Sequence, residues 1–232
     1  ILHNVRLVGG CCGTTPEHIR QIKAVVRGVA AGPVRSSVSV SSPRPASTSA
    51  FAGSRVEGPQ TPREQKSHFA HAMARGTFVV AVELLPPRGH QTEAIIERAR
   101  TLKIRGVDVI NIPDGPRAGA LSALSLAVLI EQQAGVETLL HYSCRDRNLV
   151  GIQSDLLGAH AMGLRNLLLI TGDSSRVGDY PDATVVFDID SIGLTNLVAR
   201  LNHGCDVGGQ RVGAPTAYHI GVSVNPAALS GG

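Results

Sequence analysis

The sequence predicts an α/β fold, namely a partial (β/α)8 TIM barrel with about five βα units. We expect a disordered linker before it, and before that linker one strand–loop–helix remnant of a second barrel. Apolar runs recur about every 27–30 residues with helical patterns between them, which is typical of a parallel sheet. Runs such as 167–170 are continuously apolar, as expected for strands buried on both faces. Polar residues follow several strands, where parallel α/β proteins carry their chemistry.

Two architectures remain compatible with this pattern. Five units are too few for a closed barrel of about 250 residues, so the chain forms either an open doubly wound sheet or a barrel cut short. No G-x-G-x-x-G sequence follows a strand and no Walker sequence occurs, which removes the standard nucleotide-binding loops and favours the cut barrel. The chain begins with Ile1, so we expect it to start inside a longer protein.

The N-terminal segment, residues 1–32, has the pattern of one strand–loop–helix unit. Residues 5–8 form a short apolar run, and the glycines of 9–13 predict a tight loop. Thr15 is a suitable N-cap and Pro16 suits the first helical position. Apolar residues then recur at helical spacing: Ile19, Ile22, Val25 and Val26.

Residues 33–66 are rich in Ser and Pro and predict a flexible linker, because such a stretch cannot bury enough apolar surface to offset its ordering entropy. The whole chain has a net charge of +4. Within 34–66, five basic side chains face two acidic ones, so most of the excess lies in the linker. Phe51 is the one aromatic residue there, so a stacking platform for bases is absent and we expect no nucleic-acid binding.

Residues 67–232 carry the repeating part of the pattern. Apolar runs predict strands, and apolar residues at helical spacing predict helices. The expected strands are 77–85, 107–112, 137–143, 164–171 and 218–224. The expected helices are 92–102, 119–133, 148–163 and 191–202. Asn148 is expected to cap the third of these helices, and a longer loop at 173–187 precedes the fourth.

Composition and cysteine content argue against a membrane-spanning or exported protein. The apolar residues are aliphatic rather than aromatic, and no apolar run reaches the roughly 18 residues that a membrane span needs. The four cysteines are Cys11, Cys12, Cys144 and Cys205, and an adjacent pair is a poor disulfide framework. We therefore expect a cytoplasmic protein. A homo-oligomer is compatible with the sequence.

Three titratable residues stand at strand positions that suit chemistry. Glu83 lies within an apolar strand, where burial would raise the pKa of its carboxyl group and suit a general acid. It is alternatively a structural residue that bonds to backbone. Asp173 follows the strand 164–171 and either serves a ligand or starts a turn. His141 lies near the end of its strand, and is either a ligand contact or a core residue.

Cys11 and Cys12 follow two glycines, which permit the sharp bend that lets adjacent thiolates bind one Zn²⁺. The alternative is a pair of small buried hydrophobic residues. The segment Val8-Gly-Gly-Cys-Cys-Gly-Thr-Thr-Pro-Glu-His-Ile19 resembles the C-terminal end of the zinc-dependent homocysteine S-methyltransferases. That resemblance implies that both cysteines are zinc ligands and that homocysteine is a substrate, with a third cysteine upstream of this chain.

Residues 67–232 resemble the N-terminal part of methylenetetrahydrofolate reductase, a flavin-binding (β/α)8 barrel. Four segments carry the resemblance: Val82-Glu-Leu-Leu-Pro-Pro87, His141-Tyr-Ser-Cys-Arg-Asp-Arg-Asn148, Ile170-Thr-Gly-Asp173 and Gly178-Asp-Tyr-Pro-Asp182. The order of the two segments resembles bifunctional bacterial proteins that fuse a methyltransferase to a reductase.

This second resemblance implies roles for individual residues. Glu83 matches the general acid that protonates the folate, and Asp173 matches a carboxylate near flavin and folate. His141, Thr171 and Gly172 match positions that contact FAD. Asn225 falls where some members place a flavin-contacting Tyr, and the resemblance implies a flavin contact at this position with a different side chain.

The implied activity is reduction of methylenetetrahydrofolate by NAD(P)H through FAD, within a protein that also methylates homocysteine. Further strands of the barrel are expected beyond residue 232, so we expect the present polypeptide to have little or no activity alone. Two alternatives remain. In the first, zinc-dependent methyl transfer is the sole activity of the protein. In the second, the chain is a non-catalytic module that binds flavin or folate.

Overall fold

The structure is a computed structural model that describes residues 10, 14–27, 60–173 and 178–223. The helix expected after Pro16 is present as α1, Pro16–Arg27. The expected strand 5–8 and residues 33–59 of the expected linker lie outside the described residues. The last part of that linker is described, and it contains the short 3-10 helix η1, Arg63–Gln65.

Five parallel strands form one sheet: β1 Ala81–Glu83, β2 Val109–Ile112, β3 Glu137–Ser143, β4 Asn166–Ile170 and β5 His219–Val222. Their spatial order is the chain order, β1-β2-β3-β4-β5, and every pairing is parallel. A doubly wound sheet reverses its strand order at a switch point, and this sheet has no reversal. The order therefore supports the expected partial barrel over the open alternative.

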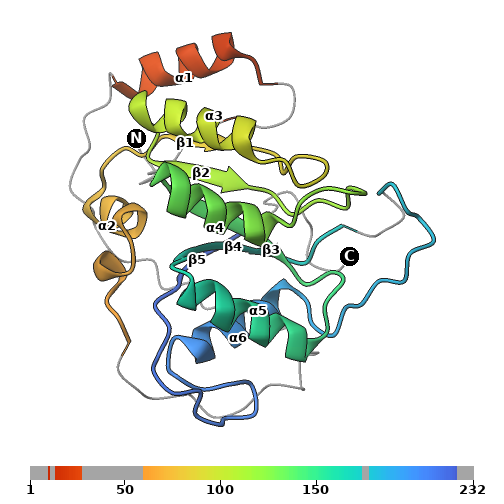
Figure 1. Ribbon diagram of the computed structural model, residues 1–232. Coiled ribbons are helices and arrows are strands. Elements are labelled where there is room, and N and C mark those ends of the chain that lie inside the picture. Colours follow the sequence, from red (N-terminus) through yellow and green to blue (C-terminus); the bar gives the residue numbers. More distant parts are fainter. Residues whose placement is uncertain (1–9, 11–13, 28–59, 174–177, 224–232) are drawn as a thin grey trace, which may run out of the picture.

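Four helices connect successive strands and cover one face of the sheet (Figure 1). They are α3 Glu93–Ile104, α4 Ala123–Ala134, α5 Leu149–Ala161 and α6 Ser191–Leu201. Asn148 caps α5, as expected, by accepting a hydrogen bond from the Gly151 amide at 2.8 Å. Helix α4 begins later than expected because Ser122 is its N-cap.

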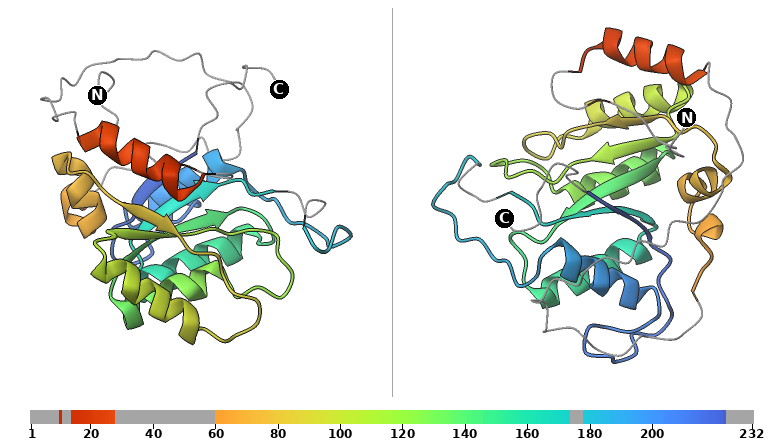
Figure 2. Two further views of the ribbon diagram at one scale, coloured as in Figure 1. Left: turned by 90° about the horizontal axis from the view of Figure 1, so that it is seen from above. Right: turned by 180° about the vertical axis from the view of Figure 1, so that it is seen from behind.

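A further helix, α2 (His68–Arg75), was not predicted from the sequence. It lies at the end of the sheet where the strands begin, opposite the long connecting loops (Figure 1). The two views of Figure 2 show α2 apart from the layer formed by α3–α6. Its boundaries have standard signals, since Ser67 accepts a hydrogen bond from the Ala70 amide and Gly76 ends the helix with a φ of 72°.

Polar contacts hold α2 against the sheet. The Glu137 carboxylate, on the first residue of β3, accepts hydrogen bonds from the amides of His68 at 2.7 Å and Phe69 at 2.9 Å. A carboxylate at a helix N-terminus also interacts favourably with the helix dipole. Ser67 donates a hydrogen bond to Asn166 on β4, so the start of α2 contacts two strands.

The two faces of the sheet differ because side chains alternate along a strand. One face packs against α3–α6 and carries large apolar side chains: Ile110, Ile112, Leu140, Tyr142, Leu167 and Leu169. On the opposite, concave face, Val109 and Leu139 form a second small core with Phe69 of α2. This core occupies the start of the strands, so the ends of the strands on the concave face are left for other side chains. Among the described residues no helix has the length and apolarity to cross a membrane.

His160 on α5 is expected to make the free energy of unfolding depend on pH. Its Nε2 accepts a hydrogen bond from the Ala217 amide at 2.9 Å, and burial lowers its pKa to about 4. An unfolded chain takes up this proton near pH 6.5, so the free energy of unfolding is expected to fall as the pH decreases from 6.5 towards 4. Urea unfolding at about pH 7.5 and about pH 5 measures this slope.

The variant His160→Gln removes the titrating group and is expected to flatten that slope. Some slope is expected to remain, because burial also lowers the pKa of His219 to about 4. A slope equal to that of the unsubstituted protein would contradict the assignment to His160.

Candidate active site

Polar side chains occupy the C-terminal half of the concave face. The strand register pairs Glu83 of β1 with Asn111 of β2, and Asn111 with Leu139 of β3. Two and four residues beyond Leu139, the same face of β3 carries His141 and Ser143. The apolar side chains near α2 are therefore followed along the strands by a row of polar ones.

Glu83 ends β1, and its side chain is exposed. The expectation that this carboxyl group is buried is wrong, because β1 is an edge strand of the described sheet and pairs on one side alone. Within the described residues no hydrogen-bond partner of the Glu83 carboxylate is found. The Glu83 carboxylate is therefore accessible to a ligand. Burial within the protein is no longer a reason to expect that Glu83 acts as an acid.

Asn111 and His141 each bury one polar atom without a partner. The Asn111 Oδ1 and the His141 Nε2 are both shielded from solvent, and neither makes a hydrogen bond to the described residues. Burial lowers the pKa of His141, with Asp114 opposing the shift, so the imidazole is neutral near pH 7. Unpaired buried polar atoms are costly, and a bound ligand is one of the reasons they persist. Asn111 was missed in the sequence, although an amide within the apolar run 109–112 was the available signal.

The residues after β4 pass close to β3. Gly172 has a φ of 92°, and a Cβ atom there would lie 2.9 Å from the Cβ of Ser143. No other residue fits this crossing without displacement. Thr171 accepts a hydrogen bond from the Ser191 amide at 3.1 Å, so its hydroxyl contacts the start of α6. The Asp173 side chain is exposed at the end of this segment.

A buried guanidinium connects the loops at the ends of the strands. The Arg145 side chain is 5% exposed and donates from Nε to Asp146 at 2.6 Å. Its second and third nitrogens face Asp114 at 3.8 Å and the Asp173 carbonyl at 3.4 Å. Ser143 donates a hydrogen bond to Asp114 at 2.7 Å. The loops after β2, β3 and β4 are thus joined through one side chain.

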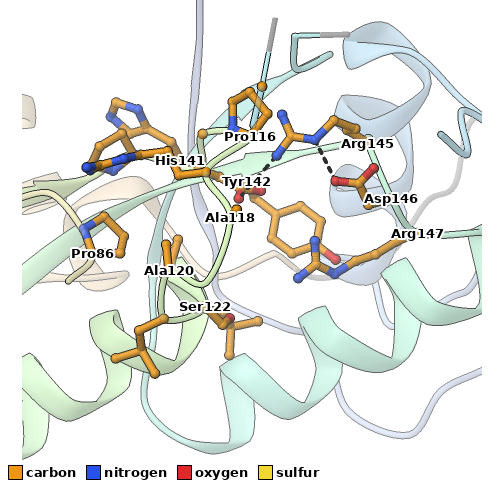
Figure 3. A pocket seen from close by; sticks show the side chains of 18 of the residues that line it. Pro86, Pro116, Ala118, Ala120, Ser122, His141, Tyr142, Arg145, Asp146 and Arg147 are labelled. Atoms are coloured by element: carbon orange, nitrogen blue, oxygen red, sulfur yellow. Dashed lines mark hydrogen bonds and ion pairs between the residues drawn. The ribbon is translucent and has the colours of Figure 1, made fainter. Parts of the chain in front are cut away.

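A cavity of about 590 Å³ lies beside this network (Figure 3). Loops after β1, β2, β3 and β4 all contribute to its wall, and His141, Tyr142 and Arg147 line it. Arg147 donates to Asp155 at 2.6 Å and its guanidinium lies 5.4 Å from the centre of the Tyr142 ring. Of the residues predicted from the sequence, His141 lines this cavity, while Glu83, Thr171, Gly172 and Asp173 do not.

The segment 178–186 reaches over the cavity from the loop after β4. The Asp179 carboxylate accepts hydrogen bonds from the Arg88 guanidinium and from the Ala118 amide, both at 2.9 Å. At the other end of the segment, the Val186 carbonyl accepts from the Asp146 amide at 3.2 Å. The segment is therefore attached on both sides of the cavity, to loops after β1, β2 and β3.

The remaining residues to place are Cys144, the predicted zinc ligands and Asn225. Cys144 is buried, and this burial, with a smaller effect of Asp190, raises the pKa of its thiol to about 12, so it is not a reactive thiolate near pH 7. Cys11, Cys12 and Asn225 lie outside the described residues. Among the described residues, no group of three or more His, Cys, Asp or Glu side chains is suited to bind a metal ion.

Two matches to known families accompany this geometry. Residues 68–209 match the family described as methylenetetrahydrofolate reductase, and this match spans the chain from α2 through α6. Residues 1–26 match the family described as homocysteine S-methyltransferase, a segment that includes most of α1.

The attachment of segment 178–186 gives a testable prediction. Replacing Asp179 with Ala removes the acceptor for Arg88 and Ala118, so amide hydrogen exchange within 178–186 is expected to accelerate. The change in unfolding free energy is expected to stay within about 1 kcal/mol, because the ion pair is exposed. The control is Asp182→Ala, which changes an exposed carboxylate in the same segment. Equal exchange rates in the two variants would contradict the proposed attachment.

Proposed function

Because the chain belongs to the methylenetetrahydrofolate reductase family, we propose that it reduces 5,10-methylenetetrahydrofolate to 5-methyltetrahydrofolate with FAD as cofactor and NAD(P)H as reductant. The observation that carries this proposal is the pair of unpartnered buried atoms, Asn111 Oδ1 and His141 Nε2. Both belong to the face of the sheet that also carries the accessible Glu83 carboxylate.

FAD fits the residues of this face. An isoalloxazine ring offers both an N–H donor and carbonyl acceptors, which are the partners that an amide oxygen and an imidazole nitrogen lack. His141 also lines the adjacent cavity of about 590 Å³, a volume within the range of cofactor pockets. When bound, the flavin supplies the hydride chemistry, while the protein supplies orientation and charge.

The proposed binding residues are Asn111, His141, Thr171, Gly172 and Asp173, with Asn225 as a further contact outside the described residues. Gly172 lets the backbone after β4 pass close to Ser143 and Arg145, which holds Thr171 and Asp173 near the end of β3. Asp173 would add a negative charge near the flavin and the folate. The neutral His141 imidazole would bind without adding charge.

Glu83 is the proposed general acid. It would donate a proton to the folate, so that the reactive iminium form of the substrate can arise. In the described residues Glu83 is accessible and has no competing hydrogen bond, which supports contact with a substrate.

The N-terminal segment supports a second proposal. The match of residues 1–26 favours homocysteine methylation by the same protein, with Cys11 and Cys12 as thiolate ligands of Zn²⁺. Zinc content and methionine formation without flavin would favour methyl transfer as the one activity. Flavin or folate binding without electron transfer would favour a non-catalytic module.

The test of the general acid is Glu83→Gln in the intact, flavin-loaded enzyme. FAD is expected to stay bound, while folate reduction falls by about 100-fold or more, because the amide cannot donate the required proton. Reduction of the flavin by NAD(P)H, measured by stopped-flow absorbance, is expected to continue. The matched control is Glu93→Gln, an exposed Glu in the first turn of α3. Folate turnover like that of the unsubstituted protein would remove Glu83 from the mechanism.

The test of flavin binding is His141→Ala. Loss of the imidazole removes one partner of the ring, so the affinity for FAD is expected to fall by roughly tenfold, as for one lost hydrogen bond. Quenching of FAD fluorescence on titration measures this affinity. The control is His71→Ala, because His71 is exposed on α2 at the other end of the strands. If the two variants bind FAD equally well, the flavin does not contact His141.

A further inference from the structure

Arg145 is the most buried charged side chain at the rim of the sheet, and the proposed reaction does not use it. Its side chain is 5% exposed, and its three nitrogens face three different partners. Two of those partners are carboxylates, on Asp114 and Asp146, and the third is the backbone carbonyl of Asp173. A buried guanidinium is expensive unless it is paired, and here two acidic groups compensate its charge.

We propose that Arg145 is a positioning residue for Asp173, an inference that rests on the proposed function. The hydrogen bond of 3.4 Å from Arg145 to the Asp173 carbonyl fixes the backbone that carries the carboxylate. The Asp173 side chain is exposed and makes no hydrogen bond to the described residues, so the position of its backbone sets the region that the carboxylate can reach. Arg145 therefore acts through Asp173 and need not contact the flavin or the folate.

The surrounding backbone supports this assignment. Gly172, which precedes Asp173, has a φ of 92°, and a Cβ atom there would lie 3.2 Å from the Cβ of Arg145. The chain thus crosses directly over Arg145 just before the carboxylate. Asp146 has a φ of 67°, and among the described residues it is the one non-glycine residue with a positive φ. Such conformations cost energy and concentrate at functional sites.

A hydrogen bond between Ser143 and Asp114 connects the side chains around Arg145 to strand β3. Asp114 receives a hydrogen bond from Ser143 at 2.7 Å in addition to its contact with Arg145. Ser143 belongs to the polar row of the concave face, two residues beyond His141. The position of Asp173 is thereby related to the strand that carries the proposed flavin contact.

The experiment compares Arg145→Met and Arg145→Lys with a matched control, Arg100→Met. Arg100 also donates to a backbone carbonyl, that of Gln133, and pairs with a carboxylate, that of Glu97, but it lies on α3 away from the rim. Lysine keeps the charge of Arg145 and offers one donor centre in place of the planar fork. The Met variant tests loss of the whole group, and the Lys variant keeps the test valid if the Met variant does not fold.

The first measurement needs no ligand. In ¹⁵N-labelled protein, the Asp173 amide is expected to give one signal in the unsubstituted chain and in Arg100→Met. In the Arg145 variants it is expected to give a broadened or divided signal. An unchanged Asp173 signal in an Arg145 variant that folds overturns the proposal. This readout stands even if the protein binds no flavin, a result that would instead contradict the proposed function.

The second measurement is a double-mutant cycle with Asp173→Asn, read as the rate of folate reduction by the intact, flavin-loaded enzyme. Arg145→Lys is expected to lower this rate by about tenfold, and to change it by less than about twofold when Asp173 is already Asn. The KM for folate is expected to change less than kcat, since the substrate contacts remain. Equal losses in both backgrounds would show that Arg145 acts independently of Asp173 and would overturn the proposal.

Discussion

The parallel register of the five strands is the constraint on which the candidate site depends. Because β1, β2 and β3 pair in parallel, side chains at matching positions share one face and one end of the sheet. Glu83 and Asn111 are paired in register, and His141, two residues beyond the partner of Asn111 on β3, lies on the same concave face. A shift of one residue in any pairing would send the side chain of that strand to the helix-covered face. The large apolar residues on that face make such a shift costly.

The sequence was sufficient for elements whose signals are local. Strand β3 has the predicted bounds, Glu137–Ser143, because its buried side chains lie within a short segment that ends at the polar loop 144–148, and α5 begins at its predicted cap, Asn148. Helix α2 was missed, since it is short and its stability depends on Glu137, far along the chain. The expected burial of Glu83 was wrong because burial depends on how many strands flank β1, which a local apolar pattern does not report.

The candidate site could be predicted from the sequence only where its signals are local. His141 stood out in sequence because it interrupts an apolar strand, and its buried unpaired nitrogen agrees with a role in binding. Arg145 gave no such signal, because a charged residue after a strand is most often a solvated loop residue. Its burial follows from the approach of the segment after β4, and that approach requires Gly172. Contacts between loops of different strands are the part that local patterns do not contain.

Helix α2 limits where a ligand can lie on the concave face of the sheet. Phe69 fills the concave face near the start of β2 and β3, and the contacts of Glu137 and Ser67 keep the helix there. Among the described residues, the base on this side of the sheet is therefore closed by packed side chains near the start of β2 and β3. A ligand on the polar row therefore cannot extend past Phe69 towards the start of these strands, and its remaining length must project towards the loops that follow the strands.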